Sequence, residues 1–113
     1  MPKFNAVIPV LPVKELANVT EFYNALFGEP TMEPADGIAE WEVAPGAWVQ
    51  VAEIPERAGQ AAVVLGTDDL LGLVADLKSR GIGVSSVEDF GVVMIAVAVD
   101  PEGNELQLAE ETE

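Results

Sequence analysis

The segment LQLAE at residues 106–110 closely repeats the segment VQVAE at residues 49–53. Both segments alternate polar and apolar residues, as a β-strand with one buried face does. A second pair is also similar: IPVLPVKEL at residues 8–16 and AVVLGTDDL at residues 62–70 each run an apolar strand into an acidic helix start. Chance similarity between short apolar strands is the alternative explanation, but two pairs in the same order favour an internal duplication.

The spacing of apolar residues predicts a strand, a helix and three strands, and then the same order again. In the first half we expect a strand at 4–11, a helix at 14–27, and strands at 37–43 and 48–54. In the second half we expect a strand at 60–66, a helix from Asp68 or Asp69 to Arg80, and strands at 84–87, 92–99 and 105–109. The prediction is a single α+β domain, residues 1–113, made of two βαβββ modules at about 1–56 and 57–113.

The net charge indicates which classes of partner the protein can bind. The chain carries 20 acidic and 5 basic residues, a formal net charge of −15 at pH 7. Nucleic acids and anionic membranes need a basic surface, so neither is an expected partner. The charge favours cationic ligands or basic partners, although it also simply keeps a small domain soluble. The N-terminal segment has no long apolar core and no apolar run approaches ~20 residues, so we expect a soluble, cytoplasmic protein.

The chain contains no cysteine and no histidine. Disulfides, thiolate zinc sites and a cysteine nucleophile are therefore excluded. The usual general base near neutral pH is also missing. Any acid–base chemistry would depend on carboxylates, on Tyr23 or on the lysines.

Two sets of motifs carry a resemblance to a known family. PVLPVKEL at residues 9–16, followed by EFY at 21–23 and LFG at 26–28, resembles the opening of glyoxalase/bleomycin-resistance proteins, the vicinal oxygen chelate (VOC) superfamily. DPEGN at residues 100–104, with the alternating strand after it, resembles their closing hairpin. The resemblance covers nearly the whole chain. It implies two βαβββ modules with curved mixed β-sheets around a cavity, commonly in a homodimer. Open sheets with exposed edges also favour a homodimer here.

The resemblance also locates the family's metal-ligand positions. In the family's enzymes each module supplies one ligand from its first strand and one from its last, which correspond here to Ile8, Gln50, Ala62 and Gln107. Ile8 and Ala62 have no donor atom, and two neutral amide oxygens are too few to hold a divalent cation. We therefore expect no metal and no other cofactor.

Strand alternation selects residues for a ligand pocket. In the two repeated strands, the faces with Val49 and Leu106 are aliphatic and should pack under the helices. The ligand-binding candidates on the opposite faces are Trp48, Gln50, Glu105 and Gln107, with Glu40, Phe90 and Met94 as further candidates. Each has a plainer alternative: Trp48, Phe90 and Met94 as core residues, Gln50 and Gln107 bonded to each other, and Glu105 and Glu40 in solvent. Trp41 is expected in the core.

Three functions follow from these expectations. The first is a metal-independent small-molecule-binding VOC protein, which sequesters a cationic or partly apolar ligand as the acidic bleomycin-resistance proteins do. Bleomycin itself is not expected, because the stretch from 81 to 100 is shorter than in the drug binders. The second is a VOC enzyme, metal-free or metal-dependent, such as a glyoxalase-like lyase, an isomerase or a dioxygenase. The third is a dimeric regulatory partner with no small ligand. No constellation of catalytic residues stands out, so the first is preferred.

Overall fold

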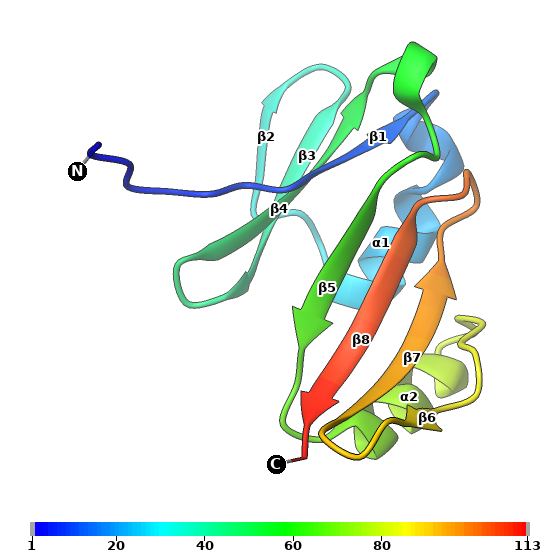
Figure 1. Ribbon diagram of the computed structural model, residues 1–113. Coiled ribbons are helices and arrows are strands. Elements are labelled where there is room, and N and C mark those ends of the chain that lie inside the picture. The colour runs from blue at the N-terminus through cyan, green and yellow to red at the C-terminus, as the bar shows by residue number, and fades with distance from the viewer. Residues whose placement is uncertain (1, 113) are drawn as a thin grey trace.

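The computed structural model describes residues 2–112 and consists of two four-stranded mixed sheets, each covered by a helix on one side (Figure 1). Sheet A has the order β1 (Val10–Val13), β4 (Ala47–Glu53), β3 (Ile38–Ala44), β2 (Met32–Ala35). Sheet B has the order β5 (Ala62–Gly66), β8 (Glu105–Glu111), β7 (Val93–Val99), β6 (Glu88–Asp89). The helices are α1 (Thr20–Phe27) and α2 (Leu70–Ser79), and short 3₁₀ turns lie at η1 (Leu16–Asn18) and η2 (Pro55–Arg57). This confirms the predicted α+β class.

The duplication is visible in the strand pairing and in the hydrogen bonds. In each sheet the first strand runs parallel to the last, and the remaining pairs are antiparallel. A carboxylate at the end of each last strand also binds the start of the helical segment of its own module. Glu53 Oε2 accepts from the Leu16 N–H at 2.9 Å, and Glu110 Oε1 accepts from the Leu70 N–H at 2.8 Å. These residues occupy matching positions in the repeated segments.

The two helices differ in how they begin. Asp69 caps α2, and its Oδ1 accepts from the Gly72 N–H at 3.0 Å, so the helix uses the second of the two predicted starts, Asp68 and Asp69. The helix predicted at 14–27 is instead split, because Val19 (φ −121°, ψ −2°) separates η1 from α1. The second module fixes this start: the Glu102 carboxylate accepts from the Lys14 and Glu15 N–H groups.

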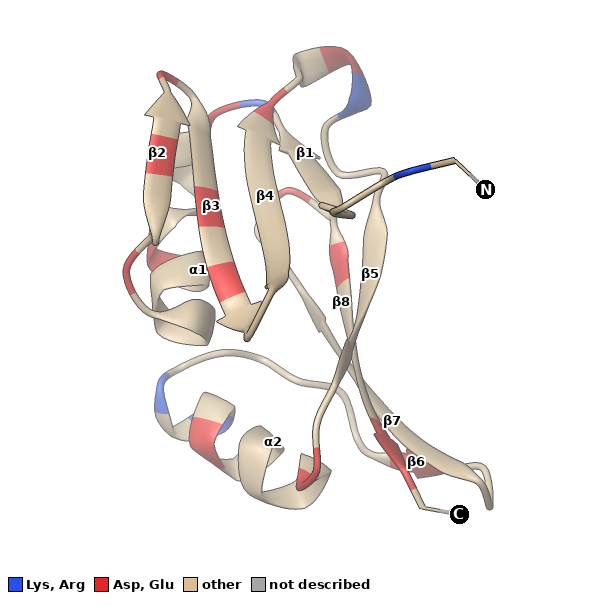
Figure 2. Cartoon of the chain, turned by 90° about the vertical axis from the view of Figure 1, so that its left-hand side faces the viewer, with Lys and Arg blue, Asp and Glu red and all other residues tan. Residues whose placement is uncertain are grey.

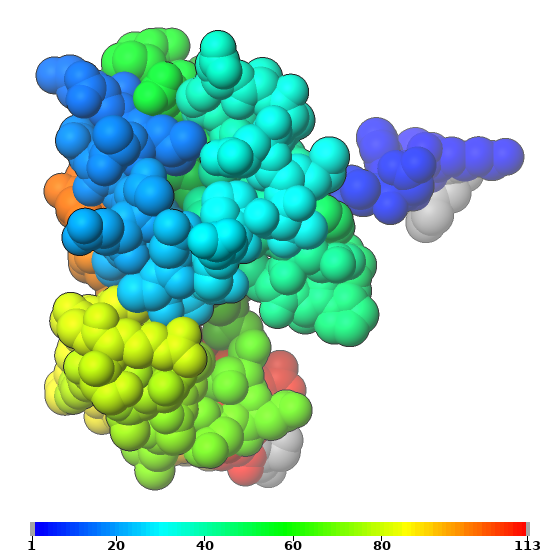
Figure 3. All heavy atoms as spheres, turned by 180° about the vertical axis from the view of Figure 1, so that it is seen from behind, coloured from blue at the N-terminus to red at the C-terminus, as the bar shows by residue number. Residues whose placement is uncertain are grey.

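Two strand predictions were wrong in extent, and one strand was missed. Of the first strand predicted at 4–11, only Val10 and Leu11 lie in β1, which pairs with β4 over residues 10–13. The arm at residues 2–9 extends away from the body (Figure 3). Phe4 in that arm is 87% exposed, because no strand of the same chain lies beside it. The edge strand β2 was not predicted, since Pro34 interrupts its pattern. The strand predicted at 84–87 is a single bridge from Val84 to Ala98, followed by the two-residue β6.

The core lies between the sheets and the helices. The aliphatic faces of the repeated strands are buried as predicted, with Val51 and Leu106 both 0% exposed. Trp41 is buried on the same side, beside the rings of Tyr23 and Phe27 at centroid distances of 5.7 and 5.8 Å. The apolar faces of both modules join in one continuous cluster.

The helix-free face of each sheet carries exposed apolar side chains. Figure 2 shows the helix-free face of sheet A toward the viewer, whereas sheet B is seen almost edge-on. Val64 on the helix-free face of sheet B is 63% exposed, and Val10 on that of sheet A is 39% exposed. Both faces are therefore open.

No helix among residues 2–112 is long and apolar enough to cross a bilayer.

The turn at residues 100–104 joins the modules through buried polar groups. Asp100 and Asn104 are 3% and 0% exposed. Asp100 Oδ2 accepts from the Tyr23 hydroxyl at 2.7 Å and from Asn104 Nδ2 at 3.0 Å. Asn104 Nδ2 also donates to the Pro12 carbonyl at 2.8 Å. The DPEGN motif at residues 100–104 thus has a structural role, because its buried side chains connect the two modules.

Candidate functional site

The helix-free face of sheet A gathers the polar and aromatic residues that the core does not use. Strand pairing places Glu40 opposite Gln50, and Glu42 opposite Trp48. We call these four residues the acidic face. Glu40, Trp48 and Gln50 are half-buried, and Glu42 is exposed. Alternation along β3 and β4 causes this arrangement, because Trp41 and Val49 take the opposite side and are buried against α1.

Glu40 and Gln50 form a hydrogen-bonded pair. Gln50 Nε2 donates to Glu40 Oε2 at 2.6 Å. The alternative of a Gln50–Gln107 bond is therefore wrong in this chain, where the two amides lie on different sheets. The bond fixes the carboxylate on an open face and leaves its other oxygen without a recorded partner among the described residues. A half-buried carboxylate held in this way can accept from a ligand cation with little loss of side-chain entropy.

Trp48 lies on the acidic face and does not belong to the core. It is half-buried, whereas Trp41 is 3% exposed beneath α1. The neighbouring Glu42 carboxylate accepts from the Gly46 N–H at 3.0 Å and so stabilises the turn of the β3–β4 hairpin. An indole face beside two carboxylates is a favourable environment for an organic cation, through cation–π and Coulomb attraction.

The helix-free face of sheet B differs in character. Gln107 lies there half-buried, paired with Val64 and Val97. Glu105 is exposed, which agrees with its plainer interpretation as a solvated carboxylate. Val99, opposite Glu105, is 51% exposed. This face is mainly apolar, with one amide and one carboxylate.

Phe90 and Met94 lie in different surroundings: Met94 is on the helix side of sheet B, and Phe90 is in the turn between β6 and β7. Met94 pairs with Glu110 on the helix side of β7 and packs against the core, as its plainer alternative held. Phe90 follows β6 and is 58% exposed, so the core interpretation is wrong for it. The hairpin turn before β7 has no second layer over it, so the ring stays in solvent.

The surroundings of Tyr23 prevent its hydroxyl from acting as a base. Its side chain is 0% exposed and donates to Asp100. Burial raises the pKa of the Tyr23 hydroxyl far above its usual value, and the hydrogen bond to Asp100 and that carboxylate's charge raise it further. A phenol that keeps its proton at all working pH values cannot act as a base.

The metal-ligand positions of the family do not fit a metal here. Ile8 lies on the arm and is 41% exposed, and Ala62 is exposed at the start of β5. Neither side chain has a donor atom, and the described residues contain no group of three or more carboxylates that could hold an ion. We derive no chemistry through a metal for this donor set.

Sequence reasoning missed part of the surroundings. Met32 lies beside Glu40 on the unpredicted strand β2. A cavity of ≈470 Å³ opens next to the acidic face at the junction of the modules. Its lining is Val10, Pro12, Ile54, Arg57, Gln60 and Ala61. Arg57 and Gln60 belong to the connector between the modules, where no periodic pattern indicates which way a side chain points.

Solved structures share this fold over their full length, whereas no family sequence model and no curated protein sequence matches the chain. A glyoxalase/bleomycin resistance protein from Catenulispora acidiphila is 27% identical, with a TM-score of 0.86 and coverage of 95% of this chain and 98% of that one. An antibiotic binding protein from a Streptomyces species, TnmS3, is 21% identical, with a TM-score of 0.82 and coverage of 99% of both chains. A lactoylglutathione lyase from Agrobacterium tumefaciens is 16% identical, with a TM-score of 0.78 and coverage of 97% and 96%.

Binding proteins and an enzyme therefore have this fold in common, so the fold alone does not decide between binding and catalysis. The paired βαβββ modules, the fastening turn at residues 100–104 and the full-length structural similarity lead to one conclusion: the chain belongs to the glyoxalase/bleomycin-resistance (VOC) superfamily.

Proposed function

We propose that this protein binds a small organic cation on the acidic face, without a metal. The observation that carries the proposal is the Glu40–Gln50 pair beside Trp48 on an open face. None of these side chains is used by the core cluster. The net charge of −15 would concentrate cations near the surface. The antibiotic binding protein of the same fold supports a binding role.

A defined probe tests this proposal. We expect octylammonium to bind the wild-type protein, and the Trp48→Phe and Glu40→Gln variants to bind it about tenfold more weakly, since each loses roughly 1.4 kcal/mol of cation attraction. Binding is followed by amide chemical shifts in an NMR titration. Thermal unfolding should change little in both variants, because neither side chain lies in the core.

Octanoate, which has the same chain and the opposite charge, is the matched control and should not bind. Equal binding of the cation by all three proteins would contradict the proposal. A large loss of stability in Trp48→Phe with unchanged binding would show that Trp48 supports the fold and does not bind the cation.

We also expect a homodimer. The arm at residues 2–9 has apolar side chains in solvent, with Val7 84% exposed, and it projects from β1 (Figure 3). Val64 and Val99 add exposed apolar surface on sheet B. Burial of such surface is the usual driving force for association. Light scattering at micromolar concentration should give twice the mass of 11.9 kDa, and deletion of residues 2–8 should weaken the dimer. A monomeric mass for the intact chain would contradict this expectation.

A further inference from the structure

The cavity beside the acidic face carries a positively charged group. Val10 forms one wall of this ≈470 Å³ cavity, and Val10 is the direct neighbour of Gln50 across the β1–β4 pairing. Arg57 and Gln60 line the same cavity, from the segment that leads from η2 to β5. The cavity and the acidic face are therefore adjacent parts of one surface.

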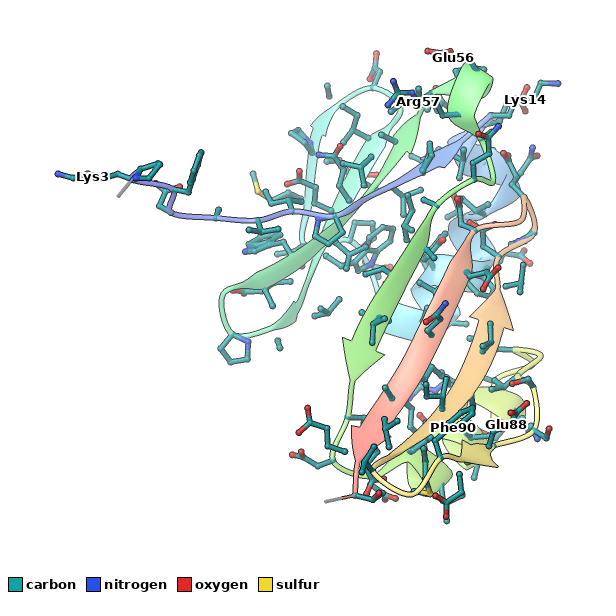
Figure 4. All side chains as sticks on the ribbon, viewed as in Figure 1. Lys3, Lys14, Glu56, Arg57, Glu88 and Phe90 are labelled. Carbon is teal, nitrogen blue, oxygen red and sulfur yellow. The ribbon has the colours of Figure 1, made fainter. Side chains whose placement is uncertain are left out.

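Arg57 differs from the other arginine of the chain. Arg80 pairs with Asp76 at 2.9 Å and donates to the Ala25 carbonyl at 3.0 Å. Within residues 2–112 the structure records no ion pair or side-chain hydrogen bond for Arg57 or for the Gln60 amide. Figure 4 shows Arg57 projecting from η2 toward the sheet A side, whereas Lys14 points away on the other side. Of the 5 basic residues of the chain, Arg57 thus lines this cavity with no side-chain partner within residues 2–112.

The chemistry of this lining suits a carboxylate. A guanidinium presents two parallel N–H groups that match the two oxygens of a carboxylate, and the Gln60 amide adds a third donor. A free anion would still be repelled by a protein with a net charge of −15. The anionic group must therefore belong to a molecule that also carries a cationic group, which the acidic face attracts.

The strand geometry sets the separation of the two charges. Glu40 on β3, Gln50 on β4 and Val10 on β1 are consecutive cross-strand neighbours. Strands lie about 4.8 Å apart, so the Glu40 position and the Val10 wall are separated by about 10 Å.

We propose that the ligand of this protein is dipolar: its cationic group lies against Glu40 and Trp48, and a carboxylate about 10 Å away lies in the cavity at Arg57 and Gln60. This inference rests on the proposed function and names the substrate class for the same site. The apolar wall of Val10 and Ile54 would contact the connecting part of the ligand.

Three probes of one length test it. Extended ω-aminooctanoate carries its ammonium and carboxylate about 10 Å apart, whereas octylammonium and octanoate each lack one charge. We expect the wild-type protein to bind ω-aminooctanoate about two- to fivefold more tightly than octylammonium, the range of a solvent-accessible ion pair. Arg57→Gln should remove this preference and leave octylammonium bound. Lys78→Gln on α2 makes the same change of charge away from the cavity and should keep the preference.

The possible outcomes distinguish a failure of the dipolar-ligand proposal from a failure of the cation site. If octylammonium binds in a manner that depends on Glu40 and Trp48, but the added carboxylate brings no gain, the dipolar ligand is ruled out and the cation site stands. A gain that survives in Arg57→Gln rules it out equally. If neither ammonium probe binds, the cation site fails and the dipolar ligand fails with it.

Discussion

Replacement of Asp100 with alanine is expected to lower the free energy of unfolding by about 3 to 5 kcal/mol, the usual cost of removing one partner from a buried charged network. The Asp100 carboxylate is 3% exposed and accepts four hydrogen bonds. They come from the Tyr23 hydroxyl, the Asn104 amide, and the backbone N–H groups of Glu102 and Asn104. Without the carboxylate these donors are left buried or lose their geometry. The two modules also lose the hydrogen bond between Tyr23 and Asp100.

Urea unfolding followed by circular dichroism measures this effect. Tyr23→Phe removes a single donor and should cost about 1.5 to 3 kcal/mol, the range of one hydrogen bond to a charged group. Asp68→Ala removes an exposed carboxylate before α2 and should change stability by less than about 0.5 kcal/mol. A cost for Asp100→Ala no larger than that of the Asp68 control would show that the turn does not fasten the modules.

The turn at residues 100–104 also lies against the connector between the modules. Gly59 has φ +76°, and a Cβ built there would lie 2.1 Å from the carbonyl oxygen of Glu102. The connector between the modules therefore passes in direct contact with the turn at residues 100–104. Glu102 itself is partly desolvated, which raises its pKa, but bonds from the Lys14 and Glu15 N–H groups and from Asn18 outweigh this and lower it. The carboxylate thus stays ionised where it holds the start of η1.

The second large effect is expected for Trp41→Ala, at about 3 to 5 kcal/mol of lost stability, because a buried indole leaves a large void. Trp41 is 3% exposed, contacts Tyr23 and Phe27, and donates from Nε1 to the Gly28 carbonyl at 2.9 Å. The substitution removes aromatic contacts and leaves that carbonyl at the end of α1 without its partner. Helix α1 should detach from sheet A more readily.

Trp48→Ala is the matched control, since it deletes the same side chain from the neighbouring strand on the opposite face. Trp48 is half-buried and has no aromatic partner among the described residues, so its removal should cost markedly less stability. Octylammonium binding should show the reverse order, with the larger loss in Trp48→Ala. Equal destabilisation by the two variants would mean that Trp48 also supports the fold. Calorimetric unfolding and the NMR titration together separate the two roles.

The repeated order of strands and helices, and the face on which most strand residues lie, could be predicted from the sequence. Alternation in VQVAE and LQLAE separated Val49, Val51, Leu106 and Leu108, which are buried, from Gln50 and Gln107, which are not. The start of α2 at Asp68 or Asp69 was also predictable, because a helix cap depends on backbone groups within a few residues. Local periodicity is sufficient for such features, since a strand or helix carries its own pattern of burial.

Contacts between residues that are far apart in the sequence could be found only in the folded structure. It paired Gln50 with Glu40 instead of Gln107, placed Arg57 at a cavity next to Val10, and left the arm at residues 2–9 without a partner strand. It also showed that the helix-free faces of the two sheets point in different directions (Figure 2). These outcomes depend on how two similar modules pack against each other. That packing is set by the Tyr23–Asp100–Asn104 network and by contacts within the shared core. The periodic pattern of a strand or helix shows which of its faces is buried, but it does not show which distant element that face contacts.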